Sequence, residues 1–128
     1  MEDIEAVKAR MLKRMMDRGR AESRAPVVLT DATFQSELSK YPAMVVDCWA
    51  EWCHPCRILS PVVDELAKEY AGRIAFGKLN VDENPRTAQA YQVMSIPTLL
   101  VFREGVYRSR VVGVKPKQAL KAEIEGSA

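Results

Sequence analysis

Residues 44–49 restrict the possible fold of this chain more than any other segment. The segment is apolar at every position except Asp47, which is too continuous for a strand with one solvent-exposed face. We therefore predict a strand that is buried on both of its faces. The composition is consistent with such a core, because 48% of the 128 residues are hydrophobic and 28% are charged, as in ordinary soluble domains.

Strand and helix patterns alternate along the chain from Val27 onward, which predicts an α/β fold in the order βαβαβα followed by ββα. The predicted strands are residues 27–29, 44–49, 74–81, 98–102 and 106–112. The predicted helices begin after a cap at Thr30 or Asp31, after Cys53, at Pro85 and at Pro116, and the second of them ends at Gly72. Only the early strands can be joined by parallel crossovers, whereas the last two form an antiparallel hairpin.

Residues 1–26 are predicted to form a unit of their own, an amphipathic helix followed by a linker, ahead of a domain at residues 27–128. Apolar side chains recur at three- and four-residue steps from Ile4 to Met16, and Gly19 is the predicted helix end. This helix can pack on its own domain or on a second copy of the chain. Alternatively, residues 1–20 can dock on another protein or on an acidic membrane surface.

Charge and apolar run length exclude several classes of function. Nineteen basic and seventeen acidic residues give a net charge of +2, too small an excess to indicate nucleic-acid binding. The longest apolar runs are far shorter than the ~20 residues that span a bilayer. Three of the first five residues, Glu2, Asp3 and Glu5, are acidic, whereas a secretory signal would carry basic residues there. We therefore expect a cytoplasmic protein without a transmembrane segment.

Cys53 and Cys56 lie at the predicted junction between a strand and a helix. The unpaired N–H groups and the dipole of the first helical turn favour a thiolate at Cys53. Cys56 is one turn further on, within reach of a disulfide. In a reducing compartment such a pair is usually catalytic, redox-sensing or metal-binding. No second cysteine pair and only one histidine are present, so we expect no metal.

Residues 49–57, Trp49-Ala50-Glu51-Trp52-Cys53-His54-Pro55-Cys56-Arg57, resemble the active-site segment of the thioredoxin family. Further matching segments, within residues 27–126, are Val45-Val46-Asp47, Pro61, Lys78-Leu79-Asn80-Val81-Asp82, Asn84-Pro85, Ile96-Pro97-Thr98, Gly105 and Gly113. The resemblance implies the thioredoxin fold, a central mixed five-stranded sheet flanked by helices. Two residues depart from the family pattern: His54 replaces a glycine and Cys48 replaces a phenylalanine.

The resemblance also implies reversible thiol–disulfide exchange with protein substrates and no cofactor. Cys53 would attack a substrate disulfide, and Cys56 would then resolve the mixed disulfide. The expected partners are protein disulfide substrates and a thioredoxin reductase or an equivalent electron donor. Two alternatives stay open at this point. One is a disulfide oxidant or isomerase, and the other is a non-catalytic adaptor that binds partners through the N-terminal helix.

Asp47 is a carboxylate inside an apolar strand, where a charge is costly unless it is paired or protonated. Burial should therefore raise its pKa and make it a candidate proton acceptor for Cys56. By resemblance, Lys78 is its charge partner. Alternatively, Asp47 is hydrogen-bonded for structure alone and Lys78 is a solvated strand residue.

The predicted substrate surface consists of Trp52, Ile96, Pro97 and Gly113. By resemblance, Pro97 follows a cis peptide bond and packs beside the disulfide. The backbone of Ile96 is then free to pair with an extended substrate segment. The alternative is a trans proline that starts a strand.

Two residues are expected to tune the redox couple. An imidazolium at His54 would stabilise the Cys53 thiolate and raise the reduction potential modestly above that of a relative with glycine; an exposed, screened imidazole would have no such effect. Pro55 suits the first helical turn, where its missing N–H costs nothing.

Cys48 is expected to be a small buried hydrophobe, with a regulatory thiol as the alternative.

Overall fold

The computed structural model describes residues 3–21 and 25–126, which form an N-terminal helix and an α/β domain. The elements in chain order are α1 (Ile4–Ala21), β1 (Val27–Leu29), α2 (Phe34–Ser39), β2 (Ala43–Trp49), α3 (His54–Glu69), β3 (Ala75–Asn80), α4 (Pro85–Ala90), β4 (Thr98–Arg103), β5 (Val106–Val112) and α5 (Lys117–Gly126). From β1 onward this order confirms the predicted alternation and the final hairpin.

The strands form one mixed sheet in the order β1-β3-β2-β4-β5. β3 pairs in parallel with β1 and β2, whereas β4 pairs antiparallel with β2 and β5. The early parallel strands and the late antiparallel hairpin are therefore as predicted. β2 is the central strand of the sheet, and its nearly continuous apolar sequence is explained by this position.

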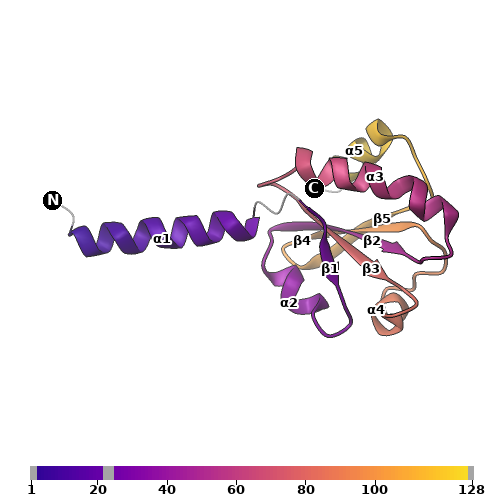
Figure 1. The fold of residues 1–128 in the computed structure, drawn as a ribbon, viewed down its shortest axis with the longest axis horizontal. Helices are drawn as coiled ribbons and strands as arrows, with labels where there is room; N and C mark the ends of the chain where they lie inside the picture. Colours follow the sequence, from indigo (N-terminus) through magenta and orange to yellow (C-terminus); the bar gives the residue numbers. More distant parts are fainter. Residues whose placement is uncertain (1–2, 22–24, 127–128) are drawn as a thin grey trace.

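The two faces of the sheet are covered by different helices (Figure 1). Because successive side chains of a strand point to opposite faces, Val45 lies in the core under α3 and α5, and Val46 lies in the core over α2 and α4. The same alternation separates two neighbouring residues of β2. Asp47 faces α3, and Cys48 faces α2 and α4.

The helix starts are decided partly by contacts between distant segments. The N-cap of α2 is Thr33, so the predicted cap at Thr30 or Asp31 is wrong. The Asp31 carboxylate instead accepts hydrogen bonds at the start of α4, from the N–H of Arg86 at 3.2 Å, from the N–H of Thr87 at 2.8 Å and from the Thr87 hydroxyl at 2.7 Å. Hydrogen bonding to Thr87 holds the pKa of Asp31 below its ordinary value.

α3 begins directly after Cys53 and continues through Pro61 to Glu69. It ends three residues before Gly72, which lies in the following turn with a φ of 86°. A left-handed conformation of this kind favours glycine. The predicted end is therefore part of the turn that leaves the helix.

α1 confirms the predicted N-terminal helix, although it runs two residues past Gly19 to Ala21. Ile4, Met11 and Leu12 are exposed on it, and the helix covers neither face of the sheet in Figure 1. Residues 22–24 of the predicted linker lie outside the described residues. Over the described parts of the chain, no helix combines the length and the apolar character needed to cross a membrane.

Candidate active site

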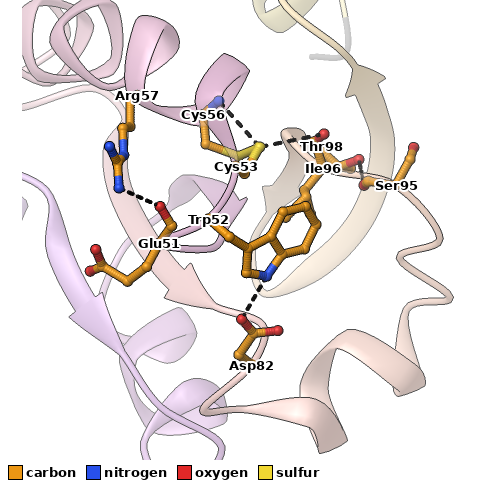
Figure 2. Close-up of a disulfide and its surroundings, with 9 residues drawn as sticks. All are labelled: Glu51, Trp52, Cys53, Cys56, Arg57, Asp82, Ser95, Ile96 and Thr98. Carbon is orange, nitrogen blue, oxygen red and sulfur yellow. Dashed lines mark hydrogen bonds between the residues drawn. A yellow bond between two sulfur atoms is a disulfide. The ribbon is translucent and has the colours of Figure 1, made fainter.

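Cys53 and Cys56 form a disulfide where the chain passes from β2 to α3 (Figure 2). Their Cα atoms are 5.3 Å apart, and each residue is only 3% exposed. Cys53 is the N-cap residue of α3 and has an extended backbone, and its N–H donates to the Ala50 carbonyl at 3.2 Å. The backbone geometry therefore holds the two cysteines at the N-terminus of α3.

The first turn of α3 presents a hydrogen-bond donor to the first sulfur, as the sequence predicts. The N–H of Cys56 donates to Cys53 Sγ at 3.3 Å. Pro55 lies in the same turn and contributes no N–H that would need a partner. A negative charge on Cys53 Sγ would be stabilised by this N–H and by the helix dipole.

The segment before β4 faces the disulfide. The Ile96–Pro97 peptide bond is cis, as the resemblance implies, and Cys53 Sγ lies 3.8 Å from the carbonyl oxygen of Ile96. This contact becomes an S–H···O hydrogen bond only when Cys53 is a thiol. The N–H of Gly113 donates to the Pro97 carbonyl at 2.9 Å, so β5 supports the same segment. Ile96, Pro97 and Gly113 are thus placed at one end of the sheet.

Trp52 projects beside the disulfide with 70% of its surface exposed. Its indole Nε1 donates to Asp82 Oδ2 at 2.9 Å, as Figure 2 shows. Trp52 and Ile96 line one hollow together with the side chain of Met94, which is 91% exposed. The sequence alone predicts no role for Asp82 or Met94. Asp82 lies in a motif that the resemblance quoted, whereas no pattern distinguishes Met94.

Asp47 is buried on the α3 side of β2, with only 2% of its surface exposed. Burial raises its pKa to about 7; attraction by Lys78 acts in the opposite direction, and the charge of Asp64 raises the pKa further. The raised pKa confirms the prediction from the sequence. Within the described part of the chain, Asp47 Oδ1 has no hydrogen-bond partner.

Lys78 lies next to Asp47 in the sheet but does not form an ion pair with it. The two residues are neighbours in the parallel register of β2 and β3. The Lys78 ammonium, however, donates to Ser60 Oγ at 2.7 Å and lies 3.1 Å from Asp64 Oδ1. Lys78 therefore attracts the Asp47 carboxylate without forming an ion pair with it, because two oxygens of α3 hold its ammonium.

A cavity of about 130 Å³ connects these groups to the disulfide. Its lining residues are Asp47, Trp49, Glu51, Cys56, Arg57, Ser60 and Lys78. Trp49 is half-buried and forms part of this wall, besides packing against the disulfide cluster. Sequence reasoning missed Ser60 and Asp64, although both follow Cys56 at steps of four residues, which places the three on one face of a helix.

Cys48 and His54 lie outside this cavity. Cys48 is fully buried in the core over α2 and α4. Burial raises the pKa of its thiol to about 12, and the Asp47 charge adds to this effect. His54 is exposed at the first position of α3.

Across residues 3–21 and 25–126, no three histidine, cysteine, aspartate or glutamate side chains gather as metal ligands would.

Comparison with known proteins identifies the family. The thioredoxin family model matches residues 25–126. The chain belongs to the thioredoxin family. It is 43% identical over 100 residues to the thioredoxin of Alicyclobacillus acidocaldarius, covering 78% of this chain and 95% of that one. It is 50% identical over 96 residues to a Staphylococcus aureus thioredoxin, covering 75% and 91%.

A solved structure supports the same conclusion. A mutant thioredoxin from Halobacterium salinarum NRC-1 superimposes with a TM-score of 0.77 at 35% identity, and the match covers 84% of this chain and 94% of that chain. The predicted thioredoxin fold is therefore confirmed. The family and the Cys53–Cys56 pair make this chain a thiol–disulfide oxidoreductase of the protein-disulfide reductase type.

Proposed function

We propose that Cys53 is the attacking cysteine of this oxidoreductase and that Cys56 is the resolving one. The observation that supports this order most directly is the hydrogen bond from the Cys56 N–H to Cys53 Sγ. The thiolate is the nucleophilic form of cysteine, and only the sulfur at the N-cap receives this donor together with the helix dipole. Cys56 lies inside the first turn and faces the cavity of Asp47.

The reaction proceeds by two sulfur transfers. In the first, the Cys53 thiolate attacks a substrate disulfide, the substrate S–S bond breaks, and a mixed disulfide forms as one substrate thiolate leaves. In the second, Cys56 loses its proton to Asp47 and attacks Cys53 Sγ, which releases the other substrate thiolate and forms the Cys53–Cys56 disulfide. The substrate disulfide gains two electrons and the cysteine pair loses two.

Asp47 is suited to this proton transfer because its pKa of about 7 lies near neutral pH. It lines the same cavity as Cys56. We assign Lys78 a role in setting the charge of that cavity. The attraction between Lys78 and Asp47 acts without direct contact.

The substrate segment is proposed to lie along Ile96 and Pro97, with Trp52 and Gly113 at its sides. The Ile96 carbonyl is beside Cys53 Sγ, so an extended backbone paired with Ile96 would place its own sulfur near the nucleophile. The apolar surface of Trp52 and the side chain of Ile96 would exclude water from the exchanging sulfurs.

Each turnover leaves the disulfide form, which a two-electron donor must reduce. A thioredoxin reductase or an equivalent dithiol donor is the expected partner, and the cytoplasm is the expected location. His54 is proposed to adjust the potential of the couple and Pro55 to shape the first turn. No bound cofactor is needed for these steps, because both electrons come from the cysteine pair.

Reduction of insulin by dithiothreitol tests the proposed function. The intact protein should accelerate insulin precipitation, and Cys53→Ser should abolish the acceleration. Cys56→Ser should form mixed disulfides with cell proteins that dithiothreitol releases and that map to Cys53. Adducts on Cys48, or adducts that Cys53→Ser does not remove, would contradict the assignment. An adaptor would keep its partners in the Cys53→Ser variant.

The division of the chain near residue 26 is proposed as a functional boundary. Among the described residues, all strands and all three core clusters lie between residues 27 and 126. A variant lacking residues 1–24 should therefore retain insulin reduction and cooperative unfolding. Loss of either would place α1 within the catalytic domain. Sedimentation of both forms measures self-association through residues 1–20.

A further inference from the structure

A polar stripe on α3 faces the buried carboxyl of Asp47. Cys56, Ser60 and Asp64 follow one another at steps of four residues, which places them on one face of the helix. The Lys78 ammonium from β3 is fixed between the last two, at 2.7 Å from Ser60 Oγ and 3.1 Å from Asp64 Oδ1. The Lys78 side chain is 22% exposed and that of Asp64 is 50% exposed, so the ion pair is partly shielded from water on the Lys78 side.

The position of Lys78 is unexpected for a cation next to a buried acid. Asp47 and Lys78 are direct neighbours in the parallel register of β2 and β3, so their side chains leave the same face of the sheet. An unpaired buried carboxylate is costly, and an ion pair between the two would reduce that cost. Asp47 Oδ1 nevertheless has no hydrogen-bond partner among the residues the structure describes.

We propose that Ser60, together with Asp64, holds the Lys78 ammonium away from Asp47 and thereby keeps Asp47 able to accept the proton of Cys56. Ser60 is thus a positioning residue that acts through Lys78. The inference rests on the proposed role of Asp47 and adds the groups that set its basicity.

The charges around Asp47 support this interpretation. Lys78 approaches from β3; Cys56, Arg57 and Asp64 approach from α3; and Glu51 approaches from the segment between β2 and α3. The facing residue of β4 is the apolar Leu99. The Arg57 guanidinium donates to the Glu51 carbonyl at 2.7 Å. The cation that lowers the pKa of Asp47 is Lys78.

A direct ion pair would change the chemistry of Asp47. An opposite charge within ~4–6 Å commonly lowers the pKa of a carboxyl by about 1–3 units. Asp47 would then be ionised well below neutral pH and would be a weaker base for a thiol. With Lys78 held by α3, burial dominates instead, and the pKa of Asp47 is about 7.

Carboxyl ¹³C NMR of the oxidised full-length protein tests the proposal, because the disulfide cysteines do not titrate in that state. Ser60→Ala should lower the titration midpoint of Asp47 by about half to one pH unit, part of the effect of a fully engaged opposite charge. Ser60→Thr keeps the hydroxyl and should retain the parent midpoint. In a Lys78→Met background, Ser60→Ala should have no effect.

An unchanged or raised midpoint in Ser60→Ala would overturn the proposal, as would an equal shift with and without Lys78. If Ser60→Ala does not fold, Asp64→Asn provides the second cycle. Asp64→Asn should lower the titration midpoint of Asp47 more in the parent background than in Lys78→Met. In the parent background it both removes a like charge and frees Lys78, whereas in Lys78→Met only the like charge is lost. Equal shifts in the two backgrounds would contradict the proposal. Failure of the proposed function is distinguishable, because insulin reduction by Asp47→Asn at the parent rate would remove the role of Asp47 without altering these midpoints.

Discussion

The backbone N–H of Cys56 donates to Cys53 Sγ across 3.3 Å, although the two residues also share a disulfide. The donor is one of the N–H groups that the first turn of a helix leaves without an intrahelical partner. Because the hydrogen bond comes from the backbone, the side chains at His54 and Pro55 can vary without removing it. The asymmetry between the two sulfurs therefore arises from the start of α3.

This asymmetry predicts a difference in acidity between the two cysteines of the reduced protein. The pKa of the Cys53 thiol should lie below that of a free cysteine, because the N–H and the helix dipole stabilise its thiolate. Alkylation by iodoacetamide across a pH series, followed residue by residue with mass spectrometry, measures it. Protein unfolded in urea is the control, and equal inflections for Cys53 in the native and unfolded states would contradict the prediction.

Cys48 should behave as an inert core residue. It is fully buried, and its thiol pKa is raised to about 12, so neither access nor thiolate formation favours reaction. We expect no alkylation of Cys48 in the native reduced protein at pH 8 and rapid alkylation in urea. Sulfenic acid or a mixed disulfide at Cys48 after mild peroxide treatment of folded protein would instead support a regulatory thiol.

The alternation of side chains along β2 could be predicted from the sequence, and it determines which residues of this strand face the site. A period of two places Asp47 and Cys48 on opposite faces whatever the surroundings. The raised pKa of Asp47 follows, because burial of both faces was already implied by the apolar segment. The position of Cys53 at a helix start followed equally from local pattern.

The contacts that sequence reasoning missed are hydrogen bonds and ion pairs between segments that lie far apart in the sequence. Asp31 caps α4, because the turn before α2 meets the start of α4. The long side chain of Lys78 has several acceptors within reach, and the packing of α3 decides in favour of Ser60 and Asp64. Gly19 did not end α1, since one glycine inside a helix costs only about 1 kcal/mol.

Asp47 should make the stability of the oxidised protein depend on pH. Burial raises its pKa from 3.8 to about 7, so between these values the folded protein holds a proton that the unfolded chain has lost. The free energy of unfolding therefore falls as pH rises through this range, by up to about 4 kcal/mol at ~1.4 kcal/mol per pKa unit.

Asp47→Asn removes this titration and should be more stable than the parent at pH 8. The advantage should shrink steadily toward pH 4, where the parent carboxyl is protonated in both states. Urea unfolding at several pH values measures the difference. Glu83→Gln is a suitable control, because Glu83 is exposed and does not line the cavity of Asp47. A difference that does not change with pH would mean that Asp47 ionises in the folded state as it does in the unfolded chain.

His54 should raise the reduction potential of the Cys53–Cys56 couple. The residue is exposed at the first position of α3, directly after Cys53. A protonated imidazole there favours the thiolate and so the reduced form, and His54→Gly should make the couple more reducing, by at most about 30 mV, which is tenfold in the exchange equilibrium. Redox titration against glutathione measures the shift.

The charge of the imidazole, rather than its size, should be responsible for that shift. His54→Gln keeps a side chain of similar size without the charge and should match His54→Gly. The difference from the parent should be clearest at low ionic strength, where the charge is least screened. It should also diminish in 1 M salt, where the screening length falls to ~3 Å. A potential that His54→Gln leaves unchanged at low ionic strength would show that solvent already screens the charge from Cys53.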